Sequence, residues 1–120
     1  MWSLDLNLSK RYETFSVKVS CPQDECSFEG KTLYVSSCDL CVEVPTTQIK
    51  VTLLKFLNHD VTVRIGNVTI AGIMSGYTIE RDRYLIGIIV SKQDRAAWKK
   101  FLADKPKVSF LTEIRHVSPL

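Results

Sequence analysis

Apolar and polar residues alternate along much of the chain, and this alternation predicts β-strands. In segment 12–20, Phe15, Val17 and Val19 would face one side of a sheet, while the polar residues between them face the other. The same pattern predicts further strands at 28–35, 40–44, 49–53, 61–65, 68–73, 77–80 and 84–90. The breaks between strands carry turn residues. Many short strands joined by tight turns predict an antiparallel sheet curled into a barrel or a sandwich.

One segment departs from this alternation and predicts a helix at about 92–104. Ser91 and Asp94 have the spacing of a capping box, with Asp in place of the usual Glu or Gln. The apolar residues that follow share one helical face: Trp98, Phe101 and Leu102. A Lys-Pro pair then ends the helix. We expect this single amphipathic helix to lie against the sheet, with its aromatic residues in the core.

The length of 120 residues suits one domain. We expect an N-terminal arm at 1–9 and a single domain at 10–120, which ends with an edge strand at 108–114 and a tail at 116–120. The hydrophobic fraction of 45% and the charged fraction of 24% are ordinary for a globular protein. The net charge of +3 permits an anionic partner without requiring one.

No segment of the sequence has the pattern of a targeting or membrane signal. The first residues include Asp5 and lack both a basic leader and a long apolar stretch. No window has the ~18 uninterrupted apolar residues that would span a bilayer. We therefore expect a cytoplasmic protein without a membrane span, a compartment in which cysteines stay reduced or bind metal.

The four cysteines have the spacing C-x4-C-x11-C-x2-C, which allows a tetrahedral zinc site. They are Cys21, Cys26, Cys38 and Cys41. The predicted strand at 28–35 argues against such a site. A strand rises ~3.3 Å per residue, so it would hold the two cysteine pairs about 35–40 Å apart if extended. We therefore favour unpaired cysteines without metal and keep zinc as the alternative. Cys41 shares a strand face with Glu43, so we expect it to be partly exposed.

The order of these elements resembles the PilZ domain. A basic pair at 10–11 precedes a barrel strand, a strand–turn–strand with Ser36 in its turn follows, and a helix with Trp98 closes the domain. Segment 83–90, Arg-Tyr-Leu-Ile-Gly-Ile-Ile-Val, is similar to a late strand of that family. The resemblance covers residues 10–103. It implies a mainly β fold: a small six-stranded antiparallel β-barrel with one C-terminal helix, in a bacterial domain family that commonly binds cyclic di-GMP.

The turn motif that binds cyclic di-GMP in PilZ domains is only partly present. That motif is [DN]-x-S-x-x-G, and with Ser36 on its serine, Tyr34 and Asp39 stand at the Asp/Asn and Gly positions. Glycine lets the backbone approach the ligand closely, whereas Asp39 adds a side chain and a negative charge that faces a dianion. This motif therefore retains its serine alone.

The arginine motif of the family, R-x-x-x-R, is also incomplete. With Arg11 as the first arginine, Phe15 takes the place of the second, and with Lys10 first, Thr14 does. Arginine can both neutralise phosphate and stack on guanine, whereas Phe15 can only stack. The resemblance thus supports the fold and argues against the standard ligand binding. It implies a protein-interaction module, as family members without these motifs are, for example in type IV pilus assembly or other surface machinery.

We therefore expect a non-enzymatic regulatory or adaptor domain that binds a protein partner of pilus, motility or surface machinery and needs no cofactor. His59 and His116 have no plausible nucleophile beside them in the sequence, and no phosphate-binding glycine motif occurs. The alternative is a sensor of cyclic di-GMP or a related nucleotide with a non-standard site, in which Lys10, Arg11 and Ser36 contact the ligand.

A third hypothesis is a barrel that binds single-stranded nucleic acid. Such grooves combine basic residues with aromatic ones. Tyr77, Arg81, Arg83 and Tyr84 gather around one predicted hairpin. A solvated turn explains these residues more simply, so we do not expect a nucleic acid partner.

Overall fold

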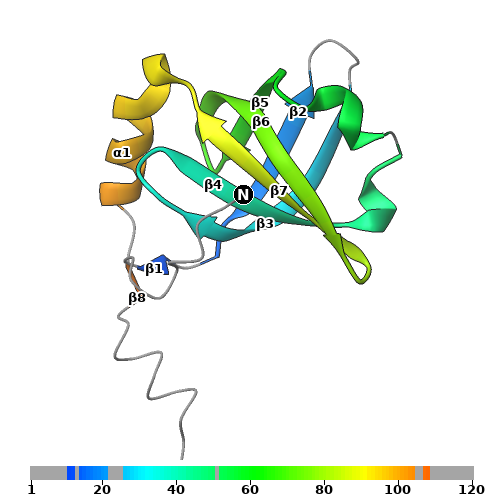
Figure 1. Ribbon diagram of the computed structural model, residues 1–120. Helices are drawn as coiled ribbons and strands as arrows, with labels where there is room; N and C mark the ends of the chain where they lie inside the picture. The colour runs from blue at the N-terminus through cyan, green and yellow to red at the C-terminus, as the bar shows by residue number, and fades with distance from the viewer. Residues whose placement is uncertain (1–10, 13, 22–25, 51, 105–106, 109–120) are drawn as a thin grey trace, which may run out of the picture.

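The computed structural model describes residues 11–12, 14–21, 26–50, 52–104 and 107–108. Its main body is a closed antiparallel barrel of six strands in the order β2-β3-β4-β7-β6-β5, which the pairing of β2 with β5 closes (Figure 1). The barrel strands are β2 (Ser16–Cys21), β3 (Cys26–Val35), β4 (Asp39–Pro45), β5 (Asp60–Ile65), β6 (Val68–Glu80) and β7 (Arg83–Val90). Helix α1 (Arg95–Ala103) follows β7 and lies against one side of the barrel (Figure 1). The predicted six-stranded barrel with a C-terminal helix is confirmed.

The alternation of apolar and polar residues along the strands produces the core of the barrel. On β2, Val17 and Val19 are buried, whereas Ser16 and Lys18 are exposed. The side chains that face inward from all six strands form one continuous cluster, which also takes in Trp98 of α1. Because side chains point alternately to the two faces of a strand, this pattern fixes which face of each strand turns inward.

Strand β6 is longer than the sequence pattern predicts. The pattern predicts two strands, at 68–73 and 77–80, whereas the structure has one strand of 13 residues. Its register with β7 shifts between Met74 and Gly76, which leaves Ser75 as an extra residue. Such a bulge bends a strand without ending it. The small residues that resemble a break in the sequence therefore mark a bend.

The predicted strand at 49–53 is wrong. This part of the chain connects β4 to β5 and contains two short 3-10 helices, η2 (Thr46–Gln48) and η3 (Leu53–Phe56). Ile49 and Leu53 are nevertheless buried in the core cluster. These apolar residues anchor the connection to the barrel. A few buried side chains in an irregular segment can by chance have the alternating spacing that is typical of a strand.

Helix α1 begins later than the capping-box pattern predicts. Ser91 precedes a 3-10 turn, η4 (Lys92–Asp94), and Asp94 is the residue directly before α1. Neither side chain caps a helix. Instead, the Asp94 carboxylate accepts a hydrogen bond from the backbone N–H of Ala71 on β6 (2.7 Å), and the Ser91 N–H donates to the Ala71 carbonyl (2.9 Å). These two bonds attach the start of the helix to the barrel.

Two short strands form a separate sheet beside the barrel. β1 (Arg11–Tyr12) pairs antiparallel with β8 (Lys107–Val108). β8 falls at the start of the predicted edge strand, and the rest of that strand, the arm at 1–9 and the tail at 116–120 lie outside the described residues. None of the helices in the described ranges is long and apolar enough to cross a membrane.

Candidate functional site

The turn between β3 and β4 is where the sequence predicts a nucleotide contact. Its Ser36 hydroxyl accepts hydrogen bonds from the backbone N–H groups of Cys38 and Asp39, both at 3.2 Å, and donates one to the Asp39 carboxylate. The Ser36 N–H also donates to the Asp39 carbonyl (2.8 Å). A hydroxyl offers one donor and two acceptor positions, so the turn itself uses the whole hydrogen-bonding capacity of this side chain.

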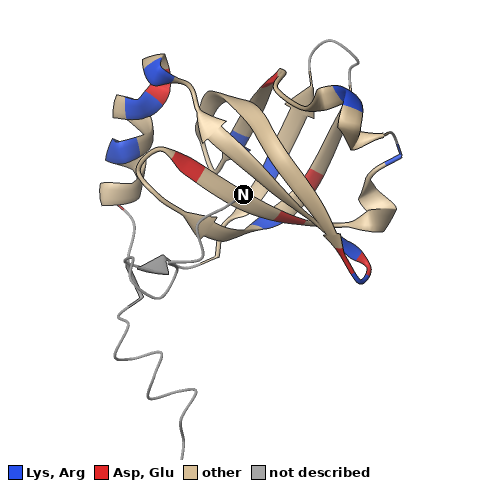
Figure 2. Cartoon of the chain, in the orientation of Figure 1, with Lys and Arg blue, Asp and Glu red and all other residues tan. Residues whose placement is uncertain are grey.

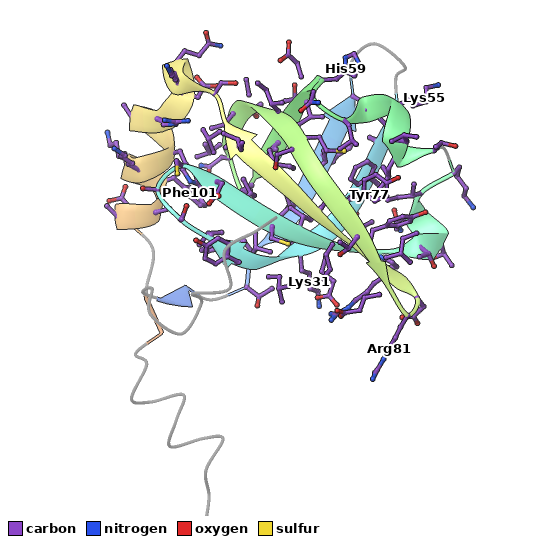
Figure 3. The ribbon with its side chains drawn as sticks, in the orientation of Figure 1. Lys31, Lys55, His59, Tyr77, Arg81 and Phe101 are labelled. Atoms are coloured by element: carbon purple, nitrogen blue, oxygen red, sulfur yellow. The ribbon has the colours of Figure 1, made fainter. Side chains whose placement is uncertain are left out.

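Helix α1 holds the same turn in place. The indole Nε1–H of Trp98 donates to the Ser36 carbonyl at 2.7 Å. Trp98 is fully buried and stacks on Phe101, with ring centroids 5.6 Å apart. Figure 3 shows Phe101 where α1 meets the end of the barrel. The predicted core role of these two aromatic residues is confirmed, and the hydrogen bond adds a link to the turn that periodicity does not predict.

Phe15, at the position of the second arginine of the PilZ motif, has a structural role. Its N–H donates to Thr32 Oγ1 (2.8 Å), and its carbonyl accepts from the Thr32 N–H (2.9 Å). Its ring contacts Phe101 edge-on, with centroids 5.6 Å apart. This position therefore joins the segment before β2 to β3 and to α1.

The remaining residues of the predicted nucleotide site lie in the segment before the barrel. The backbone of Arg11 lies in β1 opposite Val108, and Lys10 lies outside the described residues. The grouping of Lys10 and Arg11 with Ser36 around a ligand stays a prediction.

Strand β3 separates the four cysteines into two pairs. Cys21 and Cys26 are register partners at one end of the β2–β3 hairpin, whereas Cys38 and Cys41 follow the other end of β3. A single zinc ion would have to reach both ends of this ten-residue strand. Within the part of the chain that the structure describes, no three His, Cys, Asp or Glu residues are grouped as metal ligands.

Cys41 is buried, which contradicts the partial exposure expected from its strand face. Its exposed fraction is 4%, and it lies on β4 between Tyr34 on β3 and Gly87 on β7. Strand parity predicts the face of a side chain but not the size of the neighbours that cover it. Burial, reinforced by the negative charge of Asp39, raises the pKa of Cys41 from 9.0 to about 12. The thiol therefore stays protonated at neutral pH, which makes it a weak nucleophile and metal ligand.

The aromatic residues of the β6–β7 hairpin pack against each other and against the barrel. The rings of Tyr77 and Tyr84 meet edge to face, with centroids 6.1 Å apart, and both contact the core cluster. Arg81 has a positive φ of 60° in the turn and points away from the barrel (Figure 3). Both tyrosine rings are half-buried and contribute to packing of the hairpin, and nucleic-acid binding by this hairpin stays an alternative that the structure does not test.

Arg83 joins three strands through its side chain. Its guanidinium forms ion pairs with Glu43 on β4 and with Glu80 on β6, the latter at 2.6 Å between Nη2 and Oε1. The hydrogen bonds to Glu80 and Glu43 raise the pKa of Arg83 above its ordinary value, so the group stays charged at every accessible pH. This cluster ties the hairpin to the barrel wall.

A recess of about 740 Å³ in the barrel surface lies beside this ion-pair cluster. It is lined by residues of β2, β3, β4, β5, η2, β7 and two turns: Ser16, Val17, Lys18, Glu29, Gly30, Lys31, Glu43, Pro45, Gln48, Arg64, Gly66, Asp82 and Arg83. Figure 2 shows basic and acidic residues interspersed on the barrel strands and in the β6–β7 turn. A volume of this size fits a small ligand or a short peptide segment, and the lining favours a charged one.

Comparison with known proteins gives a likeness in fold. No known protein family and no curated protein matches the chain. Among solved structures, it is similar to K. pneumonia MrkH in its apo state, with a TM-score of 0.56 and 16% sequence identity. The match covers 79% of this chain and 48% of MrkH, so the chain spans about half the length of that protein. At this identity the likeness concerns the fold alone.

The recess and its ion pairs were not predicted from the sequence. Glu43 and Arg83 are 40 positions apart and meet because β4 pairs with β7. The alternation does predict that Lys18 faces outward, but it does not indicate which strands lie beside β2. The signal that could have pointed to the site is the presence of basic residues at the outward positions of several predicted strands.

Proposed function

We propose that this chain is a non-enzymatic bacterial regulatory or adaptor domain of PilZ-like fold that acts by binding another protein. The observation that carries the proposal is the Ser36 turn. Ser36 is the residue retained from the ligand motif, and its hydroxyl is fully hydrogen-bonded inside the turn. The likeness in fold to MrkH, a PilZ-domain protein, supports the PilZ-like part of the proposal.

Two further residues support a protein partner over the nucleotide of the family. Phe15 stands where the family motif has an arginine that would bind phosphate, and its ring packs against Phe101 instead. The Asp39 carboxylate lies within the turn and would repel a doubly charged ligand. We also propose a cytoplasmic location, as expected from the sequence pattern, and, as the resemblance to the family implies, a partner in pilus, motility or surface machinery.

The competing function is a sensor that binds cyclic di-GMP through Lys10, Arg11 and Ser36. To donate a hydrogen bond to a phosphate, the Ser36 hydroxyl would have to give up the one that it donates to the Asp39 carboxylate. This exchange lowers the net gain from binding, because each bond made to the ligand replaces one already made in the free protein.

Calorimetric titration of the purified protein with cyclic di-GMP, with metal content measured on the same sample, tests the proposal. We expect no binding heat and no stoichiometric zinc. We also expect the tagged chain to co-purify with the same protein partner whether or not cyclic di-GMP is added. Tight nucleotide binding that is lost in the Arg11→Ala and Ser36→Ala variants, together with no partner, would overturn the proposal in favour of the sensor.

A further inference from the structure

Three basic side chains of the recess come from three adjacent strands of the barrel. They are Lys18 on β2, Lys31 on β3 and Arg64 on β5, here called the basic trio, and all three are exposed. Lys18 is the direct register partner of Arg64 and is diagonal to Lys31, which lies two residues beyond its partner Glu29. Directly opposed Cβ atoms lie about 4.5–5.5 Å apart and diagonal ones about 7–8 Å. The long side chains of the trio can therefore converge on one anionic group.

The positive charge of the trio is not neutralised by ion pairs within the described part of the barrel. Arg83, in the same recess, contacts two carboxylates, whereas none of the trio forms an ion pair with another described residue. Glu43 is the register partner of Lys31, but its carboxylate binds Arg83. Like charges directly opposed across strands repel. Lys18 has Glu29 directly opposite on β3 and Arg64 directly opposite on β5, so attraction to Glu29 offsets part of its repulsion with Arg64, and a bound anion would remove the rest.

The acidic residues of the recess restrict what that anion can be. Glu29 and Asp82 line the same cavity as the trio. A uniform polyanion such as nucleic acid would meet these carboxylates with repulsion wherever it extended past the trio. A polypeptide segment can present carboxylates to the trio and neutral or basic groups to Glu29 and Asp82. The charge pattern therefore fits an acidic protein segment better than a nucleic acid.

We propose that the recess is the docking site for an acidic segment of the partner protein, whose Asp and Glu side chains bind Lys18, Lys31 and Arg64. This inference rests on the proposed function and names the chemistry of the partner. Complementary charge of this kind speeds association and selects the partner. Binding should therefore weaken as salt screens the exposed charges.

Selection of a random-peptide display library against the purified full chain tests the proposal. We expect the enriched peptides to be rich in Asp and Glu. A synthetic copy of the leading peptide, followed by fluorescence anisotropy, should bind the Lys18→Glu/Arg64→Glu variant at least about tenfold more weakly than the unchanged chain. Lys31→Glu is a second variant that should lose affinity on its own, and thermal melts show whether each variant is folded.

The matched control is Lys99→Glu/Lys100→Glu, which reverses the charge of two exposed lysines on α1, outside the recess. It should bind the peptide as the unchanged chain does, to within about twofold. The proposal would be overturned if the enriched peptides were not acidic, or if no peptide were enriched. It would also be overturned if the control variant lost as much affinity, or if a single-stranded oligonucleotide competed with the peptide at the trio. A partner that still co-purifies with the Lys18→Glu/Arg64→Glu variant would overturn this inference alone, whereas tight cyclic di-GMP binding at Ser36 would overturn the proposed function.

Discussion

At the residue scale, the Ser36 hydroxyl is engaged in hydrogen bonds of its own turn, and the Cys41 thiol is buried. The Ser36 hydroxyl is bonded to Cys38 and Asp39 in its own turn. The Cys41 thiol, with an exposed fraction of 4%, is protonated at neutral pH because burial opposes its charged form. Both groups therefore contribute to stability. For each of them, a substitution can test whether its role is structural.

Replacement of Ser36 with alanine removes the acceptor of two backbone N–H groups. We expect Ser36→Ala to lower the free energy of unfolding by about 1–3 kcal/mol, because the N–H groups of Cys38 and Asp39 lose their partner. Urea denaturation measures this change. Ser37→Ala, at an exposed position in the same turn, is the matched control and should change stability by no more than about 0.5 kcal/mol. Equal stability of the two variants would contradict the prediction.

The raised pKa of Cys41 predicts how stability depends on pH. Between the ordinary pKa of 9.0 and the folded-state pKa of about 12, the unfolded chain loses the Cys41 proton while the folded chain keeps it. Stability from this thiol is therefore complete below pH 9.0 and falls as the pH rises towards 12. The difference in unfolding free energy between the unchanged chain and Cys41→Ala should fall over this range. A difference that stays constant at high pH would refute the assignment.

At the element scale, hydrogen bonds to the barrel add to the packing that positions α1. Asp94 accepts from the Ala71 N–H at the start of the helix, and Trp98 donates to the Ser36 carbonyl further along. The spacing of the apolar residues predicts the face of the helix that is buried. The same spacing misassigns Ser91 and Asp94 to a capping box, because the strand that offers Ala71 is distant in the sequence.

Removal of the Asp94 carboxylate tests this attachment. We expect Asp94→Ala to lower the free energy of unfolding by about 1–3 kcal/mol, because the Ala71 N–H loses a charged acceptor at 2.7 Å. Chemical denaturation followed by tryptophan fluorescence is the measurement. Gln93→Ala, at an exposed neighbouring position, is the control and should be close to neutral. Equal loss of stability in Asp94→Ala and Gln93→Ala would contradict the prediction.

At the scale of the whole molecule, the barrel packs neighbouring strands so closely that Gly30 on β3 has no room for a side chain. A Cβ atom on Gly30 would lie 2.3 Å from the Glu43 carbonyl oxygen and 2.8 Å from Cγ2 of Val44. The backbone of β3 thus passes β4 at a distance that a side chain would not allow. Gly30 also lines the recess, so the shape of the proposed docking site depends on the same contact.

Substitution of Gly30 tests whether this close approach is needed for the fold. We expect Gly30→Ala to destabilise the protein by roughly 3 kcal/mol or more, because the backbone of β3 or β4 must move to admit the methyl group. Thermal and urea unfolding measure the change. Gly76→Ala is the matched control, since a Cβ atom there meets nothing within 4 Å. Equal loss of stability in the two variants would contradict close packing as the reason for glycine at position 30.

The local features of this protein could be predicted from its sequence, because these features depend on neighbouring residues. Alternation placed most strands, and helical spacing placed Trp98 on a buried face. The Ser36 turn was also predicted, together with the loss of most residues of the nucleotide motifs.

Which of these local segments come into contact depends on the tertiary structure. It buried Cys41, attached Asp94 to Ala71 and brought Arg83 to Glu43 across 40 positions of sequence. It also gathered the basic trio from three strands into one recess. These contacts follow from strand order and register around the closed barrel. Register arises from long-range pairing that a local pattern of apolar and polar residues does not specify.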